Sequence, residues 1–296
     1  MRYLILNADD FGLTAGVTDG VIEAHQRGLL TSTTLLVGAP DATRAARLAR
    51  GFSRLGTGLH LALSAVRPIL PPHRIGTLVD ADGRFPYSFL GVAARLSMGR
   101  INLTELEQEL EAQILAMQDL GLTITHLDGH NHLHVHPTVL PIVLRLMARH
   151  HIGALRLPRA APPLEAADLQ PASRRQTLKG YLLRVATRHA TARIQQAGVA
   201  TTDHFIGFEQ SGHLTGERLR TVLSQLPPGI TEVMLHPARM DVELTTRHAW
   251  GYDWEEELQG LLDPGVAACV QSHAITLIHY GTLPGVGELN ARSRSS

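Results

Sequence analysis

A run of alternating polar residues is the strongest chemical signal in the sequence. It reads THLDGHNHLHVHP from Thr125 to Pro137, so a histidine or aspartate occupies every second position from 126 to 136. Alternate side chains of a strand share a face and lie about 6.6 Å apart, so six of them would span roughly 33 Å. One ion with ligand bonds of about 2.0–2.2 Å reaches only a neighbouring pair. The run therefore predicts a strand in which one or two of these side chains take part in chemistry.

Two adjacent aspartates, Asp9 and Asp10, follow the apolar segment RYLIL. In extended backbone their side chains point to opposite sides, so one carboxylate can bind a metal while the other faces a reacting water. The alternative is an ordinary helix cap, because aspartate commonly begins a helix after a strand. We favour the functional interpretation, because two successive acids end the strand.

His60 lies between two leucines, where it also fits a buried core histidine. Combined with Asp10 and a histidine such as His130, it would supply one carboxylate and two imidazoles. Catalytic zinc and other divalent sites use this set and keep positions open for water and substrate. Spacing alone does not select His130 over His126 or His132.

His236 ends the segment TEVML, and the following Pro237 restricts its backbone. This position suits a general acid or base. It equally suits a histidine that only caps or supports neighbouring groups. Both interpretations remain open from the residues alone.

Short apolar, β-branched segments alternate with longer helical patterns along the whole chain of 296 residues, and no change of composition marks a domain boundary. This pattern predicts an α/β fold, a distorted (β/α) TIM-type barrel of seven to eight parallel strands. A doubly wound sheet is the alternative. We expect a single domain over residues 1–296, with an irregular insertion at about 64–100. The predicted strands are 2–6, 32–37, 57–63, 123–127, 154–158, 201–207, 231–235 and 274–280.

The active site of such a barrel lies at the carboxyl ends of its strands. Polar residues recur there in this sequence, and we expect them to converge. They are Asn7, Asp9, Asp10, His60, Asp128, His130, Arg156, His204, His236 and His279.

Composition excludes several classes of protein. The formal net charge of zero gives no overall argument for a nucleic-acid partner. Cys269 is the only cysteine, which excludes an intrachain disulfide and a multi-cysteine metal site and fits a reducing compartment. Lys179 is the only lysine, so no spare lysine serves a Schiff base, a phosphate loop or a carbamylated metal bridge. Without a secretory or transmembrane segment, we expect a cytoplasmic protein.

The segment 174–193 contains arginines and Lys179 but no acid, with apolar residues such as Tyr181 and Val185 between them. A basic amphipathic helix of this kind can lie against an anionic bilayer. A barrel helix with a solvated charged face is the more common alternative.

Five motifs follow one another over nearly the full chain: NADDFGL (7–13), TSTTLLVG (31–38), GLHL (58–61), THLDGHNHLH (125–134) and MLHPA (234–238). Together they resemble the YdjC-like carbohydrate deacetylase family. Within it, the chain most resembles the branch associated with hopanoid biosynthesis, HpnK. The segments that resemble this branch are RPILPP (67–72), LVDADGRF (78–85), HPTVLPIVLRL (136–146) and LRLP (155–158).

The resemblance implies a distorted barrel and metal-dependent removal of an N-acetyl group from an amino sugar. Position by position, it makes Asp10, His60 and His130 the ligands of one divalent ion, zinc or magnesium. It makes Asp9 the general base and His236 the general acid. We expect the substrate to contact the nearby polar residues Asn7, His132, His134 and Arg156. Asp128 would support the ligands, His126 would be buried, and His136 would lie in the turn to the next helix.

The hopanoid branch implies an N-acetylglucosaminyl hopanoid, acetylglucosaminyl bacteriohopanetetrol, which would remain in the membrane. The segment 174–193 and the loop 66–90 are then candidates for peripheral membrane contact and lipid accommodation, and the family suggests a homodimer. Oligosaccharide-processing members have a histidine where this chain has Asn131, so a chitooligosaccharide such as diacetylchitobiose is the alternative substrate.

Two other classes of function remain alternatives. One is a metal-dependent phosphoesterase or amidohydrolase on a related barrel, although many of these place His-x-His after the first strand, where this chain has Asp9 and Asp10. The other is a carbohydrate-binding or metal-storage protein without catalysis.

Overall fold

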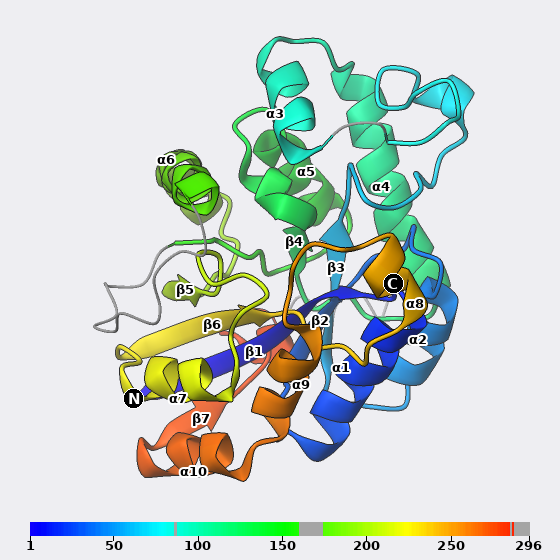
Figure 1. The fold of residues 1–296 in the computed structure, drawn as a ribbon. Coiled ribbons are helices and arrows are strands. Elements are labelled where there is room, and N and C mark those ends of the chain that lie inside the picture. The colour runs from blue at the N-terminus through cyan, green and yellow to red at the C-terminus, as the bar shows by residue number, and fades with distance from the viewer. Residues whose placement is uncertain (86–87, 160–173, 285, 287–296) are drawn as a thin grey trace.

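The computed structural model describes residues 1–85, 88–159, 174–284 and 286. Its strands form one parallel sheet that curls, with helices packed around it (Figure 1). The strands are β1 (Arg2–Phe11), β2 (Ser32–Leu35), β3 (Gly56–Leu61), β4 (Leu127–Gly129), β5 (His204–Ile206), β6 (Gly229–Leu235) and β7 (Ile275–Leu277). Their order is β4-β3-β2-β1-β6-β5, and β7 pairs with the first residues of β1.

Helices follow most of the strands, and polar side chains cap several of them. Thr14 accepts the Val17 amide at the start of the first helix, and Asn102 caps the fourth in the same way. None of the described helices is long and apolar enough to cross a membrane. The helices are α1 (Ala15–Arg27), α2 (Ala42–Ala49), α3 (Phe89–Ser97), α4 (Leu103–Asp119), α5 (Leu140–Arg149), α6 (Arg174–Gln196), α7 (Gly216–Ser224), α8 (Val242–Thr246), α9 (Trp254–Leu262) and α10 (Pro264–Ser272), with 3-10 turns η1 (Pro72–Arg74), η2 (His130–Val135) and η4 (Tyr280–Thr282).

The central strand is β1, and it is buried from Leu4 to its end at Phe11. It pairs with β6 from Arg2 to Ala8 and with β2 from Asn7 to Phe11. A strand covered on both faces is apolar without alternation, which is why RYLIL reads as a continuous apolar run. The two aspartates at its carboxyl end are therefore placed in the interior of the protein.

Among the described residues the sheet is a curled parallel half-barrel of seven strands, a number within the predicted seven to eight, but a closed TIM-type barrel is not shown. The predicted strand 154–158 forms only isolated bridges, from Leu155 to Leu127 and from Ala154 to Ala200. Neither bridge extends into a ladder, and residues 156–158 of the predicted strand belong to no bridge.

The histidine-rich run also departs from the predicted strand. Strand β4 is short, Leu127–Gly129, and the turn η2 begins directly after it. Inside η2, Asn131 and His132 have φ values of 55° and 57°, in the left-handed region. The two-residue periodicity of a strand therefore ends at residue 129, and the later histidines do not share one face.

Candidate active site

Three predicted metal ligands meet at the carboxyl ends of the strands. Asp10 comes from β1, His60 from β3, and His130 from the first position after β4. Asp10 Oδ1 lies 3.0 Å from His130 Nδ1 and 3.5 Å from His60 Nε2. Two atoms that bind one ion at about 2.1 Å lie at most about 4.2 Å apart. Both distances from Asp10 lie inside this limit, and the three ligand atoms lie within 4.8 Å of one another, so the donor set could hold a divalent ion.

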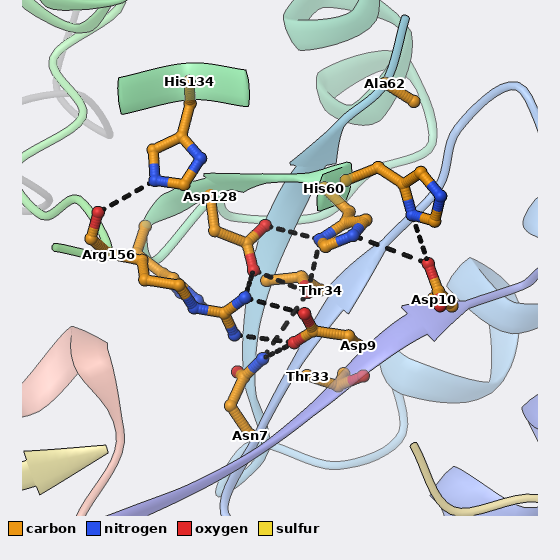
Figure 2. Close-up of polar contacts among 12 residues, drawn as sticks. Asn7, Asp9, Asp10, Thr33, Thr34, His60, Ala62, Asp128, His134 and Arg156 are labelled. Atoms are coloured by element: carbon orange, nitrogen blue, oxygen red, sulfur yellow. Dashed lines mark hydrogen bonds and ion pairs between the residues drawn. The ribbon is translucent and has the colours of Figure 1, made fainter. Parts of the chain in front are cut away.

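The second nitrogen of His60 is fixed by its neighbours (Figure 2). Its Nδ1 lies 2.7 Å from Asp128 Oδ1 and 3.1 Å from the Thr34 hydroxyl, which donates to the other Asp128 oxygen at 3.1 Å. A carboxylate behind a ligand histidine sets its orientation and raises its basicity. Burial lowers the pKa of His60, but the carboxylates of Asp128, Asp9 and Asp10 outweigh it and raise that pKa to about 9. The pocket therefore favours a positive charge at this place, either a proton or a metal ion.

Asp9 lies beside the ligand cluster and is held there by Arg156 and Asn7 (Figure 2). Arg156 donates to both of its oxygens, at 2.6 and 2.7 Å, and the Asn7 amide donates to Oδ1 at 2.9 Å. Burial raises the pKa of Asp9, but the Arg156 guanidinium more than reverses this and keeps that pKa well below its usual value. Asp9 is therefore an ionised carboxylate in a fixed orientation beside the cluster.

Arg156 is fully buried and binds three carboxylates. Besides Asp9, its guanidinium lies 2.8 Å from Asp128 Oδ2 and 2.7 Å from Glu232 Oε1. Glu232 in turn accepts from the Tyr280 hydroxyl at 2.5 Å. Bidentate geometry and full burial make this an arginine that fixes the acids of the site in place.

A small cavity of about 60 Å³ opens over the cluster. Of the four predicted substrate-binding residues, His132 lines it, whereas Asn7, His134 and Arg156 do not. Asn7 and Arg156 bind the Asp9 carboxylate without lining the cavity. His134 Nε2 contacts the Arg156 carbonyl at 2.9 Å. The cavity is lined by Asp9, Asp10, His60, His130, Asn131, His132, Phe208, Ser211, Met234, His236 and Tyr252.

His236 reaches this cavity from the end of β6. Its backbone N–H donates to the buried Glu257 carboxylate at 2.5 Å, and its ring packs 4.8 Å from the ring of Tyr252. Its Nδ1 is buried and has no hydrogen-bond partner among the described residues. Burial lowers the pKa of His236, with the charges of Asp10 and Asp9 opposing the shift. The ring is therefore positioned for proton transfer, and the free protein holds it mainly neutral at pH 7.

Three residues lining the cavity have left-handed backbone without being glycine. They are Asp10, Asn131 and His132, with φ values of 62°, 55° and 57°. Such conformations cost on the order of 1–3 kcal/mol each and persist where the surrounding structure fixes them. These residues are three of the six non-glycine residues with positive φ in the described part of the chain.

Two of the histidines expected to converge do not reach the site. His204 begins β5 and contacts the Pro228 carbonyl, and His279 follows β7 and packs against Gly56 at the start of β3. His204 is the first residue of its strand, and β7 pairs only with the first residues of β1, so His279 after β7 reaches only the start of β3. His126 is buried as expected and stacks on Tyr280 at 3.8 Å.

An aromatic segment beside the site was not recognised from the sequence. Trp250 lies 5.7 Å from the His130 ring and 5.7 Å from Tyr252, which lines the cavity. The motif HAWGYDW contains both tryptophans of the chain within seven residues. This clustering of rings was the one available signal, since the segment between Arg247 and Trp254 has no regular periodicity.

Fold and cluster together define a parallel α/β half-barrel with a candidate metal site of one carboxylate and two imidazoles. The model of the YdjC-like protein family matches residues 3–272, and the chain belongs to this family.

Relatives and a solved structure agree over nearly the whole chain. A carbohydrate deacetylase of Geobacillus stearothermophilus is 34% identical over 94% of this chain and 97% of its own. A carbohydrate deacetylase of Thermoanaerobacter pseudethanolicus is 31% identical over 96% of this chain and 100% of its own. The crystal structure of a candidate cellobiose-phosphate cleavage protein from Enterococcus faecalis matches with a TM-score of 0.77 and 28% identity, covering 95% of this chain and 98% of that one.

Proposed function

We propose that the protein is a metal-dependent N-deacetylase that hydrolyses the acetamide of an N-acetylated amino sugar. The observation that supports this best is the pairing of two functions at one strand end. Asp10 belongs to a three-ligand cluster, while the adjacent Asp9 is a fixed, ionised carboxylate in the wall of the same cavity. The relatives named carbohydrate deacetylases support an amide bond of a sugar as the target.

The residues divide the reaction between them. Asp10, His60 and His130 would bind the divalent ion, which supplies polarisation of the amide carbonyl and acidification of water when present. Asp9 accepts the proton of the attacking water, and Arg156 and Asn7 keep its carboxylate in position. His236, in its protonated form, donates a proton to the amide nitrogen as the C–N bond breaks. The products are acetate and a free amino sugar.

Acetate release from N-acetylglucosamine derivatives tests this function directly. We expect release that requires Zn²⁺ or Mg²⁺ and stops on addition of a chelator. Absence of metal-dependent release from every N-acetylated amino sugar would refute the deacetylase, and would leave the phosphoesterase and the non-catalytic binding protein as alternatives.

For the substrate, we propose the N-acetylglucosaminyl group of a hopanoid, with a chitooligosaccharide as the second candidate. The motif resemblance supports the hopanoid, and Asn131, which replaces a histidine of the oligosaccharide-processing members, lines the cavity. Mass spectrometry after incubation with acetylglucosaminyl hopanoid and with diacetylchitobiose would decide between them. Loss of an acetyl group only from diacetylchitobiose would contradict the hopanoid.

We further propose peripheral membrane contact through α6 and a homodimer. Tyr181 is 60% and Val185 38% exposed on this helix, beside the exposed Arg188. Arg184 forms an ion pair with Glu209 at 2.7 Å, which leaves its charge partly neutralised. Replacing Arg184 and Arg188 by Glu should weaken binding to anionic vesicles, and unchanged binding would count against this contact. Light scattering of the purified protein tests the dimer.

A further inference from the structure

One buried carboxylate connects two walls of the catalytic cavity. Glu257 is fully buried in α9, which lies between α1 and α7 (Figure 1). Its Oε2 accepts the backbone N–H of His236 at 2.5 Å, and its Oε1 accepts the N–H of Leu214 at 2.8 Å. Leu214 belongs to the loop after β5, which contributes two residues to the lining of the cavity. The carboxylate therefore joins the end of β6 to this loop.

The first turn of α9 contacts the same two segments through its backbone. The Asp253 N–H donates to the Gly212 carbonyl, in the loop after β5, at 2.7 Å. The Ala238 N–H, two residues beyond His236, donates to the Trp254 carbonyl at 3.1 Å. The start of α9 is therefore a common support for both walls, and Glu257 is the side chain that bonds to each of them.

The pair of bonds is specific to glutamate at this position. Two N–H donors that converge on one side chain need two acceptor oxygens, which an ionised carboxylate supplies. The amide of glutamine has one acceptor oxygen, and its NH₂ group would face the second N–H. Aspartate has both oxygens, but its side chain is one methylene shorter. Neither replacement therefore makes both bonds in the same geometry.

Stability alone does not account for a carboxylate here. Burial of a charge without a cation beside it costs free energy. Burial raises the pKa of Glu257 to about 7, the two N–H bonds only partly oppose this shift, and the charges of Asp253 and Asp9 add to it. Groups held in such an environment occur preferentially at functional sites.

The His236 ring needs support of this kind. Its Nδ1 is buried and has no hydrogen-bond partner among the described residues, and the ring packs 4.8 Å from the Tyr252 ring and 6.1 Å from the Trp254 ring. The direction of the ring therefore depends on these contacts and on the backbone that carries it. Glu257 fixes that backbone directly.

We propose that Glu257 is a positioning residue for the proton donor: anchored by Leu214, its carboxylate holds the backbone of His236 so that the ring faces the leaving nitrogen. The inference rests on the proposed deacetylase function and adds to it a residue that touches neither substrate nor metal. Because it acts through His236, its removal should affect turnover more than substrate binding.

Replacement of Glu257 by Gln tests the proposal with little change of volume. A small misplacement of a catalytic group can cost about 100-fold, so we expect kcat to fall about 10–100-fold while KM changes less than about twofold. Glu257→Asp, which keeps the charge but not the reach, should lower kcat in the same way. Elemental analysis should find the metal content of both variants as in the wild type.

Glu256→Gln is the matched control, because the same change falls one position earlier on α9 at an exposed side chain. It should leave kcat as in the wild type. In the His236→Gln background, Glu257→Gln should lower kcat less than about twofold, because the ring that it positions is already gone. An equal fold loss in both backgrounds, or loss of metal in Glu257→Gln, would assign Glu257 a general structural role and overturn the proposal.

NMR of the metal-free protein separates this inference from the proposed reaction, because it needs no turnover. Glu257→Gln should shift the amide protons of His236 and Leu214 and also the ring signals of His236, whereas Glu256→Gln should shift none of them. If no amino sugar is deacetylated but the ring signals change, the positioning role stands and the proposed reaction fails. If deacetylation is found and Glu257→Gln leaves kcat and the ring signals unchanged, the reaction stands and the positioning role fails.

Discussion

Removal of Arg156 should destabilise the protein strongly and in a pH-dependent way. Arg156→Ala leaves Asp9, Asp128 and Glu232 buried without the guanidinium that lies within 2.6–2.9 Å of each. Breaking a buried ion pair costs about 3–5 kcal/mol. With three carboxylates left behind, we expect a loss at the upper end, about 5 kcal/mol. This is a large part of the free energy of unfolding of a typical protein, about 5–15 kcal/mol.

The direction of the pH effect follows from the pKa shifts. Burial raises the pKa of Asp9 and of Asp128, and Arg156 reverses this and lowers both below the usual 3.8. In the wild type their charged forms therefore stabilise the fold above about pH 4, and this contribution is lost as the pH falls. In Arg156→Ala the guanidinium that most strongly opposes burial is gone and only weaker histidine interactions still lower these pKa values, so the carboxyls take up protons at a higher pH. The difference in stability should be largest at pH 7.5 and smaller at pH 5.

Urea unfolding of chelator-treated protein, followed by circular dichroism at both pH values, measures this difference. Chelation matters because a bound ion would add its own stabilisation. Arg149→Ala is the matched control: its side chain is 52% exposed and contacts Glu111 at 2.9 Å, so its loss should cost at most about 1 kcal/mol. A loss below about 1 kcal/mol in Arg156→Ala, or one that does not shrink at pH 5, would refute the assigned role.

Three further results are expected at the catalytic site. Asp9→Asn should abolish acetate release yet still bind metal, whereas His130→Ala should lose the metal. Elemental analysis beside the activity assay checks both variants. Loss of metal in Asp9→Asn would contradict the division of roles between the two aspartates. His236→Gln should lower kcat about 10²–10⁴-fold, and the decline of wild-type kcat toward alkaline pH should disappear in this variant, because burial lowers the pKa of His236 below 6.5. Metal binding at pH 7 should release a proton, since His60 has a pKa of about 9 in the metal-free protein. The measured enthalpy of metal binding should then differ between two buffers of different ionisation enthalpy. Equal binding enthalpies in the two buffers would contradict this.

The strands can be predicted from the local sequence because a buried strand contains mostly apolar residues. RYLIL and TEVML both end in apolar residues, and both become strands in the interior of the sheet, β1 and β6. The histidine-rich run was harder, because its alternation suggests a strand while Asn131 and His132 adopt left-handed backbone. Tertiary contacts override the local pattern there.

The role of Arg156 could not be read from its neighbours in the sequence. We expected a substrate contact, because it follows an apolar segment at a predicted strand end. Its partners Asp9 and Glu232 lie 147 and 76 positions away along the chain. A polar residue at a strand end can face the cavity or support another side chain from behind, and only the assembled sheet distinguishes the two.

The position of β1 at the centre of the sheet has a consequence for how the protein folds. Asp10 and His130 are 120 residues apart in sequence, and they meet only after β2 and β3 have paired between β1 and β4. Contacts of such long separation form late, because much chain entropy must be lost before they stabilise the fold. The metal pocket is therefore completed near the end of folding, and uptake of the ion in a refolding experiment would report the last step of sheet assembly.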